Sequence, residues 1–130
     1  MKCLCKSLLT LSFIFFIIII GLRIYTYNNL SSSAAIIDQF NPLVKTEKVY
    51  TKTTQTFDHK YPDAVTKIDN FAYVQTCYTS NGQKRKLAYI SFGKKLKSNK
   101  ILELTVKGQK VKGWQEISVQ DVPKRIIPFL

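Results

Sequence analysis

A single histidine limits the chemistry that this 130-residue chain can perform. His59 is the only histidine, so any Ser-His-Asp or Cys-His arrangement must use it. It lies between residues 55 and 70, where Pro62, Asp63 and Asp69 indicate an irregular loop. Nothing in its neighbourhood suggests a paired nucleophile, so we expect His59 to lie on the loop surface and the protein not to be an enzyme.

Metal and cofactor sites also lack ligands. One histidine and one cysteine after residue 5, Cys77, are too few for a transition-metal cluster. Asp58, Asp63 and Asp69 do not have the spacing of a calcium loop, and no glycine-rich phosphate loop is present. We expect no metal and no cofactor. Cys77 is expected to be a small buried strand residue, with an intermolecular disulfide or a reactive thiol as the alternative.

Positive charge is the remaining chemical signal. The chain has 20 Lys plus Arg against 8 Asp plus Glu, and a net charge of +12. Between residues 84 and 112 a dense basic set is opposed by one acid, Glu103. This candidate anion-binding face comprises Lys84, Arg85, Lys86, Lys94, Lys95, Lys97, Lys100, Lys107, Lys110 and Lys112. Such a face would concentrate polyanions, whereas the alternative is a solvated surface without a dedicated partner.

An apolar segment near the N-terminus determines where this charge is placed. Residues 8–22 are apolar with three exceptions, Lys2 and Lys6 precede them, and Arg23 follows. A membrane-spanning helix needs about 20 such residues, so residues 1–27 are expected to be a signal or transmembrane anchor segment. The positive-inside bias puts the N-terminus in the cytoplasm and the C-terminal domain outside the cell membrane. Small-residue triplets within Ser32–Ala35 keep cleavage open, and cleavage would give a secreted domain.

The segment after the anchor is polar at first. Residues 28–35 read NNLSSSAA, which predicts that residues 28–43 form a flexible linker. Residues 44–130 remain for one small domain. No disulfide can stabilise this domain internally, because Cys77 is its only cysteine.

That domain has the pattern of short strands. Alternating apolar and polar residues predict strands at 49–54, 71–79, 84–92, 101–107 and 114–118. Asn81-Gly82 predicts a hairpin between the second and the third. Asp121 is expected to cap a short C-terminal helix that has Pro123 in its first turn and ends at Pro128. The order predicts a mainly β fold, a small five-stranded antiparallel barrel of the oligonucleotide/oligosaccharide-binding (OB) type.

Aromatic residues interleave with the basic ones. Tyr89 shares a strand face with Leu87, which predicts a place in the core. The direction of Tyr78, Phe92 and Trp114 stays open, because exposed aromatics on an OB surface stack bases or sugar rings whereas buried ones fill the barrel.

Several segments match a known family in their order and spacing. They are Tyr78–Lys84, Lys95–Lys97, Ile101–Leu104, Val111–Ile117 and Asp121–Lys124. In these pieces the chain resembles the YxeA-like family, small exported proteins of Gram-positive bacteria with a domain of unknown function. Val49–Lys52 is similar to the first strand of the family, although Thr53 stands where an apolar residue is expected. The resemblance implies an OB-like barrel outside the membrane, and it supplies neither catalytic residues nor a ligand.

Two functions are compatible with these features. The first is a membrane-tethered binding module that contacts an anionic envelope component, such as wall polymer or lipid head groups, through the basic face. The second is an envelope-stress or peptide-immunity accessory protein that acts through a membrane protein partner. Nucleic acid is an unlikely ligand, because the domain is expected outside the cell.

Overall fold

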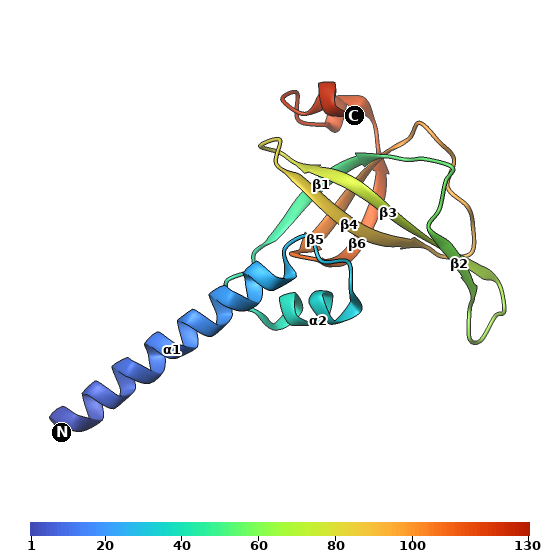
Figure 1. Cartoon of the computed structure of the whole chain (residues 1–130). Coiled ribbons are helices and arrows are strands. Elements are labelled where there is room, and N and C mark those ends of the chain that lie inside the picture. The colour runs from blue at the N-terminus through green and yellow to red at the C-terminus, as the bar shows by residue number, and fades with distance from the viewer.

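The computed structural model describes residues 1–130 as two helices followed by a curled β-sheet (Figure 1). Helix α1 (Lys2–Thr26) projects away from the sheet, and the shorter helix α2 (Ser32–Phe40) lies near the end of α1 that meets the sheet. The mainly β fold and the N-terminal apolar helix agree with the sequence prediction. The six strands are β1 (Thr46–Lys52), β2 (His59–Pro62), β3 (Asp69–Thr79), β4 (Lys84–Ser91), β5 (Ile101–Lys107) and β6 (Lys110–Ile117).

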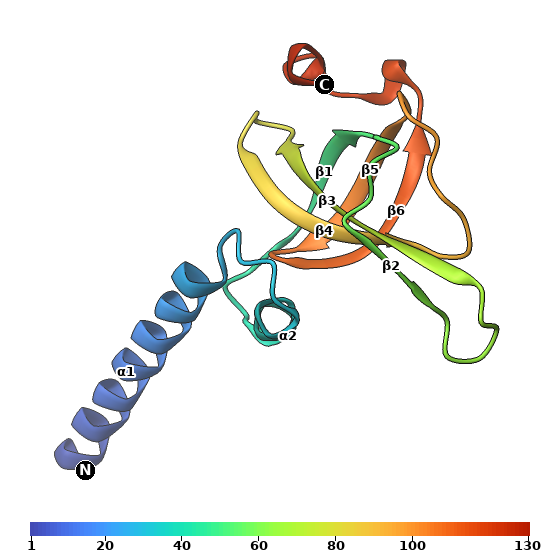
Figure 2. The ribbon, with the colours of Figure 1, turned by 45° about the vertical axis from the view of Figure 1, so that its right-hand side comes forward.

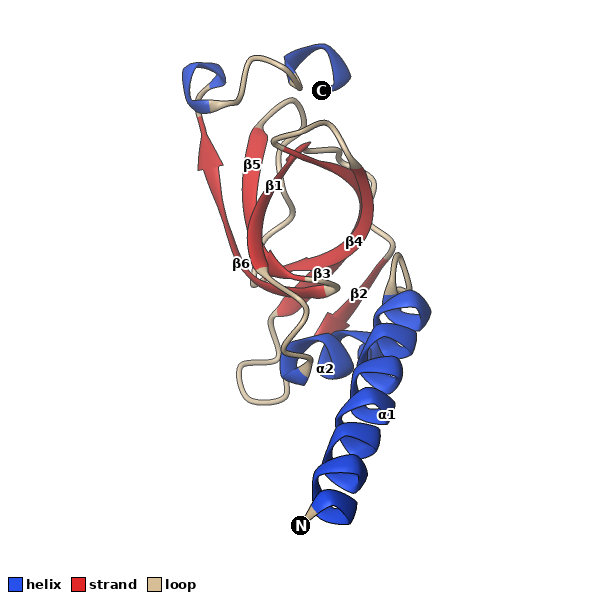
Figure 3. Cartoon of the chain, turned by 90° about the vertical axis from the view of Figure 1, so that its left-hand side faces the viewer, coloured by secondary structure: helices blue, strands red, loops and turns tan.

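The sheet is antiparallel and strongly curled. Its strands are hydrogen-bonded in the order β2-β3-β1-β5-β6. Strands β1 and β2 share one edge of β3, and β4 pairs with the opposite edge. Figure 3 shows the curl of the sheet. The curl brings part of β4 into contact with β6, and we call the line along which they approach the seam. One side chain bridges the seam, because Trp114 Nε1 donates to the carbonyl oxygen of Ile90 at 2.9 Å. The expected five-stranded barrel is therefore corrected to a curled sheet of six strands in which β4 and β6 are not paired.

The additional strand, β2, lies within residues 55–70, which we expected to be irregular. It pairs with Asp69–Ala72 at the start of β3, whereas β1 pairs only with the end of β3, at Tyr78 and Thr79. The first half of that edge is therefore free for β2. Pro62 weakened the prediction of a strand, but a proline is tolerated at the end of an edge strand.

The hairpin between β3 and β4 confirms the prediction made from Asn81-Gly82. The Gly82 amide donates to the Thr79 carbonyl oxygen at 2.9 Å, and the Thr79 amide donates to that of Gln83 at 3.0 Å. Among the residues of this turn, only Gly82 has a positive φ, of 87°. The turn is thus a three-residue loop that ends on a left-handed glycine, a common hairpin geometry.

Alternation along the strands builds the core. Leu102, Leu104 and Val106 of β5 are at most 1% exposed, while the residues between them are partly exposed. From β3 and β4, Tyr73 and Tyr89 stack with ring centroids 5.4 Å apart. The predicted core position of Tyr89 is confirmed, because this ring is 2% exposed. Apolar burial of this kind is the main favourable contribution to folding.

The C-terminal segment differs from its prediction. Instead of a helix capped by Asp121, two 3₁₀ turns end the chain, Val119–Asp121 and Ile127–Phe129. The Asp121 carboxylate accepts a hydrogen bond from the Ser118 hydroxyl at 3.0 Å and lies at the end of the first turn. Pro123 and Pro128 stand too close together for a stable helix between them. Val122 and Ile126 bury their side chains beside Tyr50 in a second, smaller core.

Residues 28–43 are not the flexible linker that we expected. They contain α2, whose first turn is capped by the Ser31 hydroxyl oxygen, which accepts from the Ala34 amide at 3.2 Å. Ala34 and Asp38, one helical turn apart, are both fully buried. The segment is ordered because one face of α2 packs on the rest of the molecule.

Helix α1, with 25 residues, is long and apolar enough to cross a membrane. Most of its large apolar side chains are exposed, which is compatible with a signal or an anchor.

Candidate binding groove and junction

The residues with catalytic potential do not come together. His59 is exposed on β2, and its Nδ1 lies 2.8 Å from a carboxylate oxygen of Asp58, with no nucleophile in contact. Cys77 is a fully buried strand residue, as expected, and burial raises the pKa of its thiol to about 12. A thiol with such a pKa is a poor nucleophile at neutral pH.

Arg85 does not belong to the basic face. The alternation of β4 exposes Lys84 and Lys86 and turns Arg85 inward, where it is 2% exposed. Its guanidinium donates to Glu47 Oε1 at 2.9 Å and to Gln109 Oε1 at 3.0 Å. Desolvation by burial lowers the pKa of Arg85. The prediction placed ten basic residues on one surface, and this one is part of the interior.

Six of the other nine residues line two adjoining hollows along the seam. The larger hollow, about 830 Å³, lies between α2 and the facing edges of β4 and β6. The smaller one, about 320 Å³, lies beside the β4–β5 connection. Lys94 and Trp114 line both, so we call the two together the seam groove. Its lysines are Lys94, Lys95, Lys97, Lys100, Lys110 and Lys112.

Most of the seam-groove lysines carry uncompensated charge. Only Lys100 has a carboxylate partner, Glu116, at a long 3.9 Å. Lys95 lies over the ring of Phe57 with its Nζ 5.4 Å from the ring centroid. This cation–π contact brings no compensating negative charge. The remaining members of the predicted face, Lys84, Lys86 and Lys107, lie outside the groove.

The three aromatic side chains whose direction was open take different positions. Trp114 is half-buried and packs edge-on against Tyr89, with ring centroids 6.4 Å apart. Tyr78 is half-buried and stacks on Phe129 at 5.3 Å. Phe92 is 71% exposed at the rim of the larger hollow. The seam groove therefore combines lysine ammonium groups with apolar and aromatic surface.

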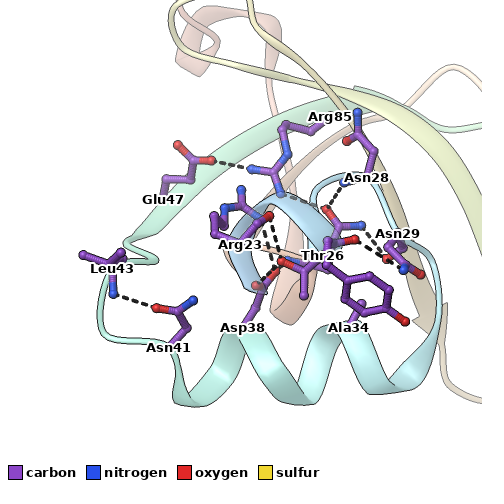
Figure 4. A network of polar contacts seen from close by, with 12 residues as sticks. Arg23, Thr26, Asn28, Asn29, Ala34, Asp38, Asn41, Leu43, Glu47 and Arg85 are labelled. Atoms are coloured by element: carbon purple, nitrogen blue, oxygen red, sulfur yellow. Dashed lines mark hydrogen bonds and ion pairs between the residues drawn. The ribbon is translucent and has the colours of Figure 1, made fainter. Parts of the chain in front are cut away.

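A buried polar network holds α2 as one wall of this groove (Figure 4). Its centre is Asp38 on α2. The Thr26 hydroxyl donates to one carboxylate oxygen of Asp38 at 2.6 Å, and the other carboxylate oxygen accepts from the backbone amide of Gln109 at 2.7 Å. Arg23 forms an ion pair with the same carboxylate at 3.3 Å. We call this network the junction, because it joins α1 and α2 to the turn between β5 and β6.

Gln109 extends the junction to β4. Its side-chain oxygen accepts from Arg85 and from the Asn28 amide, and its side-chain nitrogen donates to the carbonyl oxygens of Asn29 and Lys86. The neighbouring Gly108 has a φ of 58°, and a Cβ at this position would lie 2.2 Å from a carboxylate oxygen of Asp38. Only glycine allows this approach.

Sequence reasoning missed the junction entirely. One signal was present, because Asp38 is the only acid in the first 46 residues and stands among apolar neighbours. A lone carboxylate on an apolar helix face requires a partner when it is buried. Its partners are 12, 15 and 71 positions away, at Thr26, Arg23 and Gln109, so no local pattern could identify them.

Comparisons with known proteins identify a family for this chain. The family model "Protein of unknown function (DUF1093)" matches residues 42–120. The uncharacterised protein YxeA of Bacillus subtilis is 26% identical over 91 residues, which cover 70% of this chain and 73% of that protein. The crystal structure of a DUF1093 family protein from Bacillus subtilis is also 26% identical, with a TM-score of 0.58 over 69% of this chain and 95% of the other. The chain thus belongs to the DUF1093 family, which confirms the YxeA-like resemblance of its motifs.

Proposed function

We propose that this protein is a non-enzymatic, membrane-anchored module that binds an anionic component of the cell envelope in the seam groove. The observation that carries the proposal is the gathering of six lysines around one hollow surface that also contains Trp114. A phosphate-bearing chain can contact both features of the groove. The lysine ammonium groups bind its phosphates, and the apolar surface binds the links between the phosphates.

The strand arrangement supports an elongated ligand. We treat the curled sheet as an opened OB-type barrel, in which β4 and β6 are the strands whose pairing would close it. OB folds bind oligonucleotides and oligosaccharides across an exposed face of the barrel. Here the open seam offers a comparable surface, bordered by α2 on one side.

The junction supports retention of α1 as an anchor, and the positive-inside bias of Lys2 and Lys6 supports a sheet domain outside the cell. Cleavage within Ser32–Ala35 would cut inside α2 and remove Arg23 and Thr26 from the buried carboxylate of Asp38. A buried carboxylate that loses its partners is costly. The free, secreted domain is therefore the less favoured form.

A titration of the full chain in neutral detergent tests the proposal. The ligands are a phosphate-rich wall polymer, phosphatidylglycerol vesicles, phosphatidylcholine vesicles and single-stranded DNA, each at low and physiological salt. We expect binding to one anionic envelope ligand that survives physiological salt. A lysine near an anionic surface contributes about 1 kcal/mol, so the triple variant Lys94→Gln, Lys110→Gln, Lys112→Gln is expected to weaken binding about 100-fold at low salt.

The matched control removes the same charge elsewhere. Lys67→Gln, Lys84→Gln, Lys124→Gln changes three exposed lysines outside the seam groove and is expected to leave most of the affinity. Equal loss in both triple variants, or binding to every polyanion that disappears at physiological salt, would show that the lysines form only a solvated surface. The accessory role through a membrane protein partner would then be the better hypothesis.

A further inference from the structure

Helix α2 leaves an apolar surface without a partner. Phe40 is 76% exposed, and Ile36, one helical turn earlier, is 56% exposed. Leu43, three residues after Phe40, continues the same surface with 44% exposed. Ile36 and Phe40 are four residues apart and share one face of α2, whereas Leu43 follows just beyond the end of the helix. We call these three exposed apolar residues the strip.

A hydrogen bond between Asn41 and Ile19 sets the position of the C-terminal end of α2 along α1. The Asn41 side-chain amide, directly after Phe40, donates to the carbonyl oxygen of Ile19 at 3.0 Å, and both residues are buried. Ile19 precedes the end of the apolar run at Leu22 by three residues, or about 5 Å at the rise of an α-helix. The C-terminal end of α2 therefore lies at the level of the last apolar turns of α1.

We infer that α2 lies in the outer surface of the lipid bilayer, with Phe40 and Leu43 inserted among the acyl chains and Ile36 at the border with the seam groove. Interfacial helices bury their apolar face about 5–10 Å below the head groups, which matches the level set by Asn41 and Ile19. The inference rests on the proposed anchoring of α1 in a membrane, and it does not depend on the ligand of the seam groove.

Charges near α2 agree with this placement. Lys107 donates to the carbonyl oxygen of Gln39 at 2.7 Å, and exposed Lys45 follows shortly after α2. Both ammonium groups are placed to meet lipid phosphates while the C-terminal part of the apolar strip enters the chain region. The acid of α2, Asp38, faces away from the strip into the junction.

Site-directed spin labelling of the full chain in vesicles tests the inference. The background is Cys3→Ser, Cys5→Ser, with buried Cys77 left in place. Single labels are attached at Phe40→Cys and Leu43→Cys in vesicles of phosphatidylglycerol and phosphatidylcholine. Collisions with oxygen report apolar surroundings, and collisions with a water-soluble nickel chelate report water. We expect the oxygen-to-nickel collision ratio at positions 40 and 43 to exceed that of an aqueous site several-fold.

Two reference positions separate the possible failures. Ile14→Cys lies in the middle of the apolar run, and Val119→Cys is an exposed apolar position in the 3₁₀ turn after β6. The segment that follows β6 lies at the end of the molecule opposite α1 (Figure 2). Labels at 40 and 43 that match position 119, with position 14 in the bilayer, would overturn the placement of α2 and leave the anchor intact. An aqueous label at position 14 would overturn both. Agreement of positions 40 and 43 guards against a local effect of either substitution.

Discussion

The sheet interior and the junction are built on opposite principles. Inside the sheet, Tyr73, Leu87 and Leu104 pack in an apolar cluster whose members come from alternate strand positions. At the junction, Asp38 and Gln109 occupy an equally buried site but are held by hydrogen bonds from α1, β4 and the loop after α1. Apolar packing is not directional, whereas each buried polar atom needs a partner in a defined direction. The sheet interior is therefore expected to tolerate conservative apolar substitutions. A polar substitution at the junction that removes one hydrogen-bonding atom is not expected to be tolerated.

The two regions also differ in how much of each the family model covers. The family model covers residues 42–120 and so includes the sheet and Gln109, but not Arg23, Thr26 or Asp38. The helices that complete the junction lie outside the matched range. The family match therefore describes the sheet together with one residue of the junction, Gln109.

The largest effect is expected from a cavity in the sheet. Leu104 is fully buried on β5 and pairs with Val49 on β1. Leu104→Ala removes buried methyl groups and leaves a void, which costs about 2–5 kcal/mol of unfolding free energy. Urea unfolding in detergent, followed by Trp114 fluorescence, measures this change. Val119→Ala, at an exposed position, is the control and is expected to change stability by less than about 0.5 kcal/mol. A similar stability for both variants would contradict the assigned core.

A smaller and more local effect is expected at the junction. Asp38→Ala leaves the Gln109 amide without its acceptor and Arg23 without its ion pair. An unsatisfied buried donor costs about 1–3 kcal/mol, and the loss falls on the contact between α2 and the sheet. Limited proteolysis within residues 28–45 is expected to accelerate, while the urea transition of the sheet changes little.

Two variants sharpen this test. Gln39→Ala changes the neighbouring residue of α2, whose exposed side chain makes no junction contact, and it is expected to be resistant like the wild type. Gly108→Ala approaches the junction from the sheet side, because its Cβ would collide with Asp38. It is expected to reproduce the proteolytic sensitivity of Asp38→Ala. Resistance in Gly108→Ala would show that the turn and α2 are not in contact.

The same contrast explains what the sequence could predict. Alternation located β3, β4 and β5, and it put Leu87 and Tyr89 of β4 on one face, because strand periodicity is a local property. The hairpin at Gly82 was equally local. The short strand β2 was missed, since it exists only because an edge of β3 is free, and that requires knowledge of where β1 ends.

The basic face was predicted only in part for a related reason. The inward turn of Arg85 follows from the same alternation that exposes Lys84 and Lys86, so the signal was present. The prediction counted Arg85 with its charged neighbours, since arginine is rarely buried without a partner. What makes burial acceptable is the pairing with Glu47 and Gln109, residues from other parts of the chain. Long-range polar pairing is the property that local patterns do not encode.

The smallest effect is expected from a polar contact on the outer face of the sheet. Lys48 Nζ donates to Glu103 Oε1 at 2.9 Å, and this hydrogen bond is the main cause that lowers the pKa of Glu103 below its ordinary value of 4.5. A carboxyl group whose pKa is lower in the folded state stabilises the protein above its unfolded pKa. That stabilisation is lost as the pH falls below about 4.5 and through the lower folded value.

Glu103→Gln isolates this contribution. The wild type is expected to be more stable than the variant at pH 7, and the difference should shrink towards zero as the pH falls below 4.5, the ordinary pKa of this carboxyl group. Thermal unfolding over a pH series measures it, and added salt should reduce it, because the ammonium of Lys48 is largely exposed. A pH-independent difference would assign the effect to packing. A difference larger than that of Asp38→Ala would reverse the contrast, since it would make an exposed ion pair more important than a buried polar network.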